Sequence, residues 1–396
     1  MLGGRRDRWT RGGPLVNWPG RLSSPFYGQV WSRAKYVVPA AVLALLIGVA
    51  ALAWGDGGDG GGDRSAGADR AADSGAGDSG VGDDDGVSTI APGPPRTAVP
   101  GKDAIRRPLA GTTYFGVAKP DAPWNSAVLA GVGRDAGGVT PNMVEYYVNW
   151  TRGFDPGPVR AAYAQHAVPV VSWEPWAGSA KGTEQPSYAL RTIIDGAHDP
   201  YIRSFAEAVK ANRFPIALRF AHEMNGHWYP WAEPNGGNRP GEYVAAWKHV
   251  HDIFQQAGAT NVIWVWAPNT LRGADDISLK SLYPGDGYVD WVGLDAYGVA
   301  ERTAGELLNP SVNALRAFTA KPLLITETGA QPGGRKAPWI ASLFPWLASR
   351  HDVIGFIWFQ YTHAEGGGSD WTFMSSAAAQ ESFKAGARTL RLAQVP

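Results

Sequence analysis

Two glutamates in the sequence each close an apolar run, and together they could act on one bond. Glu223 lies in the stretch LRFAHEMNG and Glu327 in LLITETGA. Hydrolysis of a glycosidic bond needs two flanking carboxyl groups, one protonated to assist the departing oxygen and one ionised to attack the sugar or activate water. For either glutamate alone, the alternative is a salt-bridged residue at the rim of the fold. The pair, in a chain with 18 tryptophans, favours glycoside hydrolysis, because flat indole rings suit sugar rings.

Other chemistries fit the sequence less well. His222 precedes Glu223, but a zinc-protease HExxH motif needs a second histidine where this chain has Gly226, and His227 comes one residue late. The sequence contains neither GxSxG nor GxxxxGK[ST], the signatures of serine hydrolases and nucleotide-binding loops. It also has no cysteine, which excludes disulfides, thiolate metal sites and a catalytic thiol. We therefore expect no metal and no cofactor.

The elements that must position the glutamates follow residue 110. Eight short apolar runs begin at residues 114, 143, 168, 216, 262, 289, 322 and 353. Helical stretches are expected between most of them, at 156–166, 200–212, 240–257, 310–320 and 336–349, with a closing helix after Ser376. This alternation specifies a parallel sheet with crossover helices. Eight such units predict an α/β fold, a (β/α)8 TIM barrel.

Chemistry in such barrels sits at the carboxyl ends of the strands. Strands four and seven face each other across the mouth, so Glu223 and Glu327 can come within the short separation of a retaining mechanism. The other strand ends are rich in aromatic and polar side chains: Trp150, Trp173, Glu174, His222, Trp266, Asn269, Asp295, Tyr297 and Trp358. About half of the tryptophans are expected to fill the barrel instead of lining a cleft.

Several of these stretches together resemble glycoside hydrolase family 26. They are LRFAHEMNGHWYPW (218–231), VWAPN (265–269), YPGDGYVDWVGLDAYG (283–298), LLITETGA (323–330) and IGFIWFQYTHAEGGGSDW (354–371). The resemblance spans the predicted barrel and implies Glu223 as acid/base and Glu327 as nucleophile. It also implies that the sugar is contacted by His222, Trp228, Asp295, Tyr297 and Trp358. Trp150 and Trp173 are substrate-binding candidates from their strand-end positions alone.

The resemblance leaves the polysaccharide open. The family's best-known members are endo-β-1,4-mannanases, and others cut mixed-linkage β-1,3-1,4-glucan or β-1,3-xylan. Mannanases usually end strand three with Trp-His, whereas here Glu174 follows Trp173, and Phe359 stands after Trp358 where they often have Arg. Mannan and mixed-linkage glucan therefore both stay open. The alternative from another class is a non-catalytic, membrane-tethered carbohydrate-binding barrel, against which the two opposed carboxylates argue.

The chain before the predicted barrel (111–396) divides into three segments. Residues 1–35 are basic, and 36–54 are uncharged and long enough to cross a bilayer core of about 30 Å. Residues 55–110 are rich in Gly, Asp and Pro, which predicts a disordered linker. The basic flank predicts a single-pass anchor with the N-terminus in the cytoplasm and the barrel outside the cell. Cleavage of a signal peptide after residues 51–53 (Ala-Leu-Ala), giving a secreted protein, is the alternative.

The charge balance restricts the partners. Lys plus Arg and Asp plus Glu number 36 each, so the sequence offers no basic field that would hold nucleic acid. We expect a β-linked polysaccharide as substrate, contact with the membrane through the N-terminal segment, and a monomeric barrel.

Overall fold

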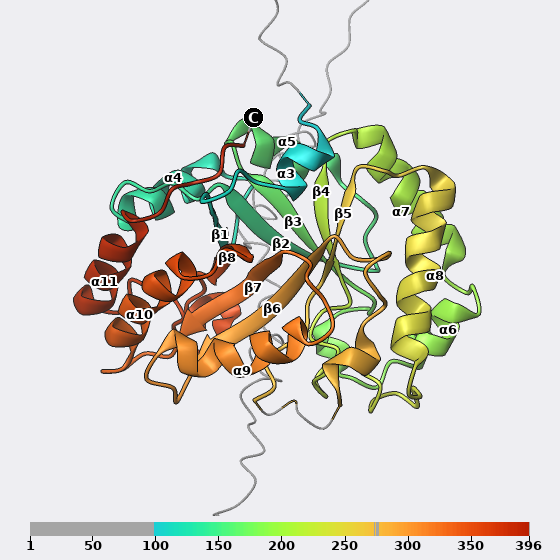
Figure 1. Cartoon of the computed structure of the whole chain (residues 1–396). Helices are drawn as coiled ribbons and strands as arrows, with labels where there is room; N and C mark the ends of the chain where they lie inside the picture. The colour runs from blue at the N-terminus through green and yellow to red at the C-terminus, as the bar shows by residue number, and fades with distance from the viewer. Residues whose placement is uncertain (1–98, 273, 275–276, 396) are drawn as a thin grey trace, which may run out of the picture.

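The structure is a computed structural model that describes residues 99–272, 274 and 277–395. Eight parallel strands close into a barrel in chain order, with β1 paired to β8 (Figure 1). The strands are β1 (Tyr114–Ala118), β2 (Met143–Asn149), β3 (Val168–Glu174), β4 (Ile216–Phe220), β5 (Val262–Trp266), β6 (Trp291–Gly298), β7 (Leu323–Ala330) and β8 (Val353–Phe359). Each predicted run forms one of them, so the predicted (β/α)8 barrel is confirmed.

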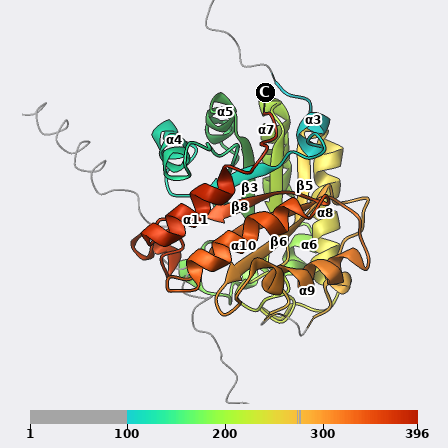
Figure 2. The same cartoon turned by 60° about the vertical axis from the view of Figure 1, so that its left-hand side comes forward.

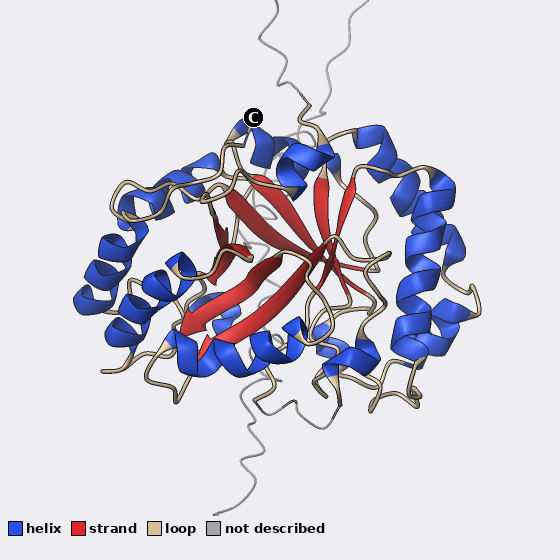
Figure 3. Cartoon of the chain, viewed as in Figure 1, coloured by secondary structure: helices blue, strands red, loops and turns tan. Residues whose placement is uncertain are grey.

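Helices surround the strands on all sides visible in Figure 3. They are α4 (Ser126–Asp135), α5 (Pro156–Ala164), α6 (Leu190–Ile194), α7 (Asp199–Asn212), α8 (Glu242–Ala257), α9 (Ala304–Arg316), α10 (Lys336–Ala348) and α11 (Ala377–Ala387). Figure 2 shows α10 and α11 side by side along the barrel. Short 3-10 helices span Ser179–Lys181, Pro186–Tyr188 and Leu279–Leu282, and a π-helical turn spans His363–Gly367.

Two helical details differ from expectation. The helix expected at 310–320 begins at Ala304, because the Thr303 side chain accepts a hydrogen bond from the Glu306 backbone N–H and caps the helix there. The helix then runs through Pro310. The second difference is α4, which was not among the expected helices.

The predicted linker ends earlier than residue 110. Lys102–Arg106 form a short helix, α3, whose Ile105 side chain is buried. The Tyr114 hydroxyl donates to the Ile105 carbonyl at 2.9 Å, and Lys102 and Arg106 pair with Asp290 at 3.1 and 2.9 Å. The expectation of disorder is therefore wrong for this part, because these contacts fasten it to the barrel despite the Pro- and Gly-rich composition around it.

The predicted membrane segment, 36–54, lies outside the described residues, as do 1–35 and the linker up to residue 98. In the part of the chain that the structure describes, no helix combines the length and the apolar character that crossing a membrane requires.

Side chains alternate along each strand between the barrel interior and the helical layer, and this alternation decides which residues reach the site. On β8, Phe356 packs outward against Phe344 of α10. Ile357 points inward, where a Cβ added at Gly116 of β1 would lie 2.7 Å from its Cγ1. On a regular strand such as β8, interior side chains at the carboxyl end therefore come from alternate positions, whereas β7 has an irregularity between Ile325 and Thr328.

Candidate active site

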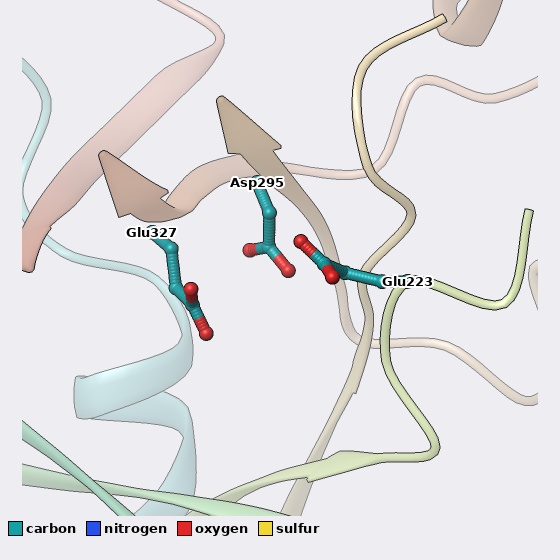
Figure 4. A group of neighbouring side chains, drawn as sticks. All are labelled: Glu223, Asp295 and Glu327. Atoms are coloured by element: carbon teal, nitrogen blue, oxygen red, sulfur yellow. The ribbon is translucent and has the colours of Figure 1, made fainter. Parts of the chain in front are cut away.

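Three buried carboxyl groups meet at the mouth of the barrel. Glu223 follows β4, Asp295 lies on β6 and Glu327 lies on β7 (Figure 4). One carboxylate oxygen from each lies within 4.8 Å of the others, and each residue is at most 1% exposed. The structure thus brings together the two glutamates that the sequence singled out. Several of these oxygens accept hydrogen bonds from protein donors, which suits acid–base chemistry and fits a metal ion poorly.

Glu223 stands on a sharp turn directly after β4. Its φ is 53°, in the left-handed region, and its backbone N–H donates to the Ala267 carbonyl at 2.7 Å. Its Oε1 accepts from Asn269 Nδ2 and its Oε2 from Trp228 Nε1, both at 2.5 Å. A strained backbone held by surrounding bonds is common where a side chain must be aimed.

The surroundings of Glu223 keep a proton on it. Burial and, second, the charge of Glu327 raise its pKa, whereas Arg219 and the bonds from Trp228 and Asn269 lower it, and the net pKa is about 7. A carboxyl group that is protonated near neutral pH can serve as a general acid and, once deprotonated, as a general base.

A buried guanidinium that the sequence interpretation missed lies among these carboxylates. Arg219 on β4 is fully buried, and both of its terminal nitrogens donate to Glu327 Oε1 at 2.7 Å. Nη2 also donates to Asp295 Oδ2 at 2.7 Å, and Nη1 to Glu145 Oε1 at 2.6 Å. The sequence contains a signal that could have identified it, because a charged residue inside the apolar run IALRF needs a buried partner.

Glu327 is held by four donors. Besides the two nitrogens of Arg219, Tyr297 donates its hydroxyl to Oε2 at 2.5 Å and Tyr147 donates to Oε1 at 2.9 Å. Burial raises the pKa of Glu327, whereas Arg219, Tyr297 and Tyr147 lower it. Tyr147 was also missed, although it lies two residues after Glu145 on β2 and so shares its inward face.

Both carboxylate oxygens of Asp295 accept hydrogen bonds from protein side chains, so this residue mainly positions its neighbours. Its Oδ1 accepts from Thr326 Oγ1 at 2.5 Å and its Oδ2 from Arg219. Burial raises the pKa of Asp295 well above its ordinary value, and the charge of Arg219 opposes the rise. Asp295 thereby ties β6 to β4 and β7 beneath the mouth.

The loop after β4 is braced by aromatic side chains. His222 Nε2 lies 3.0 Å from the Tyr229 hydroxyl, and Trp231 Nε1 donates to the His222 carbonyl at 2.7 Å. His222 is fully buried, whereas Trp228 is partly exposed while bonded to Glu223. Of these predicted residues, Trp228 presents a face at the cleft and His222 supports the loop.

Two tryptophans predicted to bind substrate lie in the helical layer instead. Trp173 stacks on Phe205 of α7, with ring centroids 4.4 Å apart, and donates to the Tyr201 hydroxyl at 3.1 Å. Trp150 packs 5.0 Å from Trp173, and both are buried. The reason is strand alternation: Ser172 bonds to Glu145 and Arg219 in the interior, so the next residue must point outward.

Trp358 was expected to contact the sugar, and the structure places it in the helical layer. Its ring centroid lies 5.1 Å from that of Phe383 on α11, and its Nε1 donates to the Trp371 carbonyl at 3.0 Å. The next residue, Phe359, faces the site, and its ring centroid lies 5.8 Å from that of Tyr297. The aromatic wall near Glu327 is therefore made by Phe359, Tyr297 and Trp371, whose ring lies 4.8 Å from Tyr297.

Comparison with known proteins identifies relatives of the barrel. The model of glycosyl hydrolase family 26 matches residues 186–329. The chain is 32% identical over 259 residues to endoglucanase H of Acetivibrio thermocellus, covering 61% of this chain and 27% of that protein. It is 32% identical over 124 residues to a mannan endo-1,4-beta-mannosidase of Bacillus subtilis, covering 30% of this chain and 31% of that protein. The chain thus spans less than a third of the length of either relative.

A solved structure of a family 26 beta-mannanase from Bacteroides ovatus has a similar fold. The TM-score is 0.54 at 17% sequence identity, over 74% of this chain and 92% of that chain. At this identity the likeness supports the barrel architecture alone.

Glu145 is a further buried carboxyl group with a neutral-range pKa. Its Oε1 accepts from Ser172 and Arg219, while its Oε2 has no hydrogen-bond partner among the described residues. Burial raises the pKa of Glu145, Arg219 lowers it and Glu327 raises it, and the net pKa is about 7 instead of 4.5. A carboxyl group whose pKa is raised by folding contributes stability below its unfolded pKa, and that contribution is lost as pH rises through the folded pKa.

We predict that Glu145→Gln gains stability relative to the parent protein as pH rises from 4.5 to about 7. Over this range the unfolded parent ionises Glu145 while the folded parent keeps it protonated, so the parent loses stability and the variant does not; the relative gain should be on the order of a few kcal/mol. Urea unfolding at pH 5 and pH 8 measures it. The exposed Glu207→Gln serves as control and should show no such trend; a gain for Glu145→Gln that is equal at both pH values would contradict the prediction.

Proposed function

The chain belongs to glycosyl hydrolase family 26, and from this premise we propose that its barrel is a retaining endo-β-glycanase with Glu223 as acid/base and Glu327 as nucleophile. The observation that carries the proposal is the pair of buried carboxyl groups after β4 and on β7, with oxygens within 4.8 Å. Retaining enzymes place these groups about 5–5.5 Å apart, whereas inverting enzymes need about 6.5–9.5 Å to fit a water between them.

The reaction has two steps. First, Glu327 attacks the anomeric carbon while the bond to the leaving oxygen breaks, and Glu223 gives its proton to that oxygen. Then Glu223 takes a proton from water, the water oxygen attacks the anomeric carbon, and Glu327 leaves as a carboxylate. Two displacements at the same carbon retain the configuration.

The neighbours of each glutamate suit its role. Arg219, Tyr297 and Tyr147 donate to Glu327, and hydrogen bonds to a carboxylate favour its ionised form, as a nucleophile requires. These fixed donors also hold the carboxylate in one orientation, so little reorganisation is needed when it attacks. Glu223 has fewer donors and a pKa of about 7, raised chiefly by burial, so it can enter the cycle protonated.

For the polysaccharide we place β-glucan first and β-mannan second. The relative named endoglucanase aligns over 61% of this chain, whereas those named mannan endo-1,4-beta-mannosidase align over 30% or less. Glu174 is fully buried at the end of β3 and Phe359 faces the site from β8. These are the two positions where the sequence departs from the mannanase pattern.

The full chain is expected to release oligosaccharides of intermediate length from barley mixed-linkage β-glucan, more slowly from galactomannan or glucomannan, and not from cellulose. Glu327→Ala should abolish release while the variant stays folded and binds polysaccharide. Glu223→Gln should lower kcat by about 10²–10⁴-fold, the contribution typical of a general acid. Chromatography of the products measures each result.

The exposed Glu207→Gln is the matched control and should act as the parent does. Full activity in Glu327→Ala would show that the nucleophile is misassigned. Release from galactomannan alone would reverse the proposed order of the substrates and place β-mannan first. Binding without hydrolysis of any polysaccharide would favour the non-catalytic sugar-binding barrel.

We also propose that residues 36–54, outside the described part of the chain, anchor a monomeric enzyme with its barrel outside the cell. The support is the uncharged run and its basic flank. The full chain should sediment with membranes through a high-salt wash, and deletion of 36–54 should release it. A soluble chain whose N-terminus begins just after Ala53 would show cleavage and secretion instead.

A further inference from the structure

A cavity of about 210 Å³ lies beside the catalytic mouth. It is lined by the end of β6, by the segments that follow β6 and β7, and by the start of α10, among them Gly298, Glu301, Gln331, Arg335, Lys336 and Trp339. Gly298 directly follows Tyr297, so the cavity opens at the same end of the barrel as the carboxylates. At about 30 Å³ per water it has room for about seven waters, roughly one sugar ring with its hydroxyl groups.

Two cations at this cavity have no carboxylate partner among the residues the structure describes. Lys336 is only 1% exposed, and its Nζ donates to the backbone carbonyl of Asp370 at 2.9 Å. Arg335 is exposed and donates to the Ala300 carbonyl at 2.7 Å. The acid of the lining, Glu301, is already paired with Arg272 at 2.5 Å. Arg335 and Lys336 therefore give the cavity an excess of positive charge. Burying a cation without a counter-charge is unfavourable, so an anionic ligand would be favoured there.

The start of α10 adds partial positive charge. This helix has 13 residues and no side-chain cap at its N-terminus. The Lys336 N–H donates to the Gly333 carbonyl at 3.1 Å, the Trp339 N–H donates to the Arg335 carbonyl at 2.9 Å, and Pro338 has no N–H. The favourable term for an anion at this end is therefore the helix dipole and not a row of free N–H groups.

A buried donor gives an independent indication of a ligand. Trp339 is 1% exposed, and its Nε1 has no hydrogen-bond acceptor within the described ranges. Its ring borders the cavity against Gly298, where an added Cβ would lie 2.7 Å from Nε1. A buried N–H without an acceptor is destabilising, and a bound acceptor would satisfy it.

We propose that this cavity is a subsite for an acidic sugar carried by the natural glycan beside the neutral residues that are cleaved, and that its carboxylate binds Arg335 and Lys336 at the start of α10. The inference rests on the proposed function, because it assumes a glycan in the adjacent cleft. A guanidinium can donate to both oxygens of a carboxylate. The Glu301 carboxylate can accept from the hydroxyl groups of the same sugar ring, and the Gln331 amide can both donate to them and accept from them. The Trp339 N–H donates to an oxygen on the edge of the sugar.

Calorimetric titration of the full chain with methyl β-glucuronide, and separately with methyl β-glucoside, tests the proposal. The glucuronide should bind saturably and at least tenfold more tightly than the glucoside. Lys336→Met keeps the buried stem and removes the charge, and should weaken glucuronide binding at least tenfold. Arg335→Gln, at an exposed position where folding is not at risk, should weaken it in the same direction. Lys280→Met, at an exposed lysine away from the cavity, is the control and should bind as the parent does.

Equal affinity for the two glycosides, or glucuronide binding unchanged in both Arg335→Gln and Lys336→Met, would overturn the proposal. Inorganic phosphate that binds as tightly as the glucuronide would show a general anion site and overturn the assignment to a sugar. Hydrolysis of β-glucan is measured separately on the same preparations. An active enzyme without glucuronide binding contradicts this inference alone, whereas an inactive one contradicts the proposed function.

Discussion

The fully buried guanidinium of Arg219 is the interaction on which the site depends. It donates to Glu145, Asp295 and Glu327, which come from three other strands, so one side chain fixes the relative position of β2, β4, β6 and β7 at the barrel mouth. One positive charge among several acids cannot neutralise them all, and burial then raises the carboxyl pKa values. Removal of one partner from such a group would leave buried charge uncompensated. The same cluster thus orders the fold and sets the protonation of the site.

The two proposed catalytic glutamates share a buried mouth but differ in their neighbours. Glu327 receives both terminal nitrogens of Arg219 and two tyrosine hydroxyls, whereas Glu223 receives one amide and one indole N–H. The difference follows from position: Glu327 lies within β7, next to the interior side chains, while Glu223 lies on the turn after β4, nearer the partly exposed Trp228. Two chemically identical groups can therefore take an ionised and a protonated role.

Much of the architecture could be predicted from the sequence, because each strand is a short apolar run and strand ends carry chemistry in this fold. The same reasoning placed Glu223 and Glu327. It failed where the register of a strand decides which of two adjacent residues faces the barrel interior. Trp173 and Trp358 point outward, while Glu174 and Phe359 point inward. An aromatic run in the sequence does not indicate which of the two neighbours points inward. Arg219 was missed because it lies within β4, before the strand end where functional residues were expected. The helix at Lys102–Arg106 was missed because its stability comes from tertiary contacts, with Asp290 far away in sequence and with Tyr114 on the first strand.

The most direct test of the account is the configuration of the first product, followed by proton NMR during hydrolysis of a β-glucan by the full chain. Attack by Glu327 followed by water predicts that the new reducing end appears first as the β anomer, with the α anomer growing in afterwards by mutarotation. If the α anomer appeared first, water would have displaced the leaving group directly. Glu327 could then not be the nucleophile, despite its short separation from Glu223.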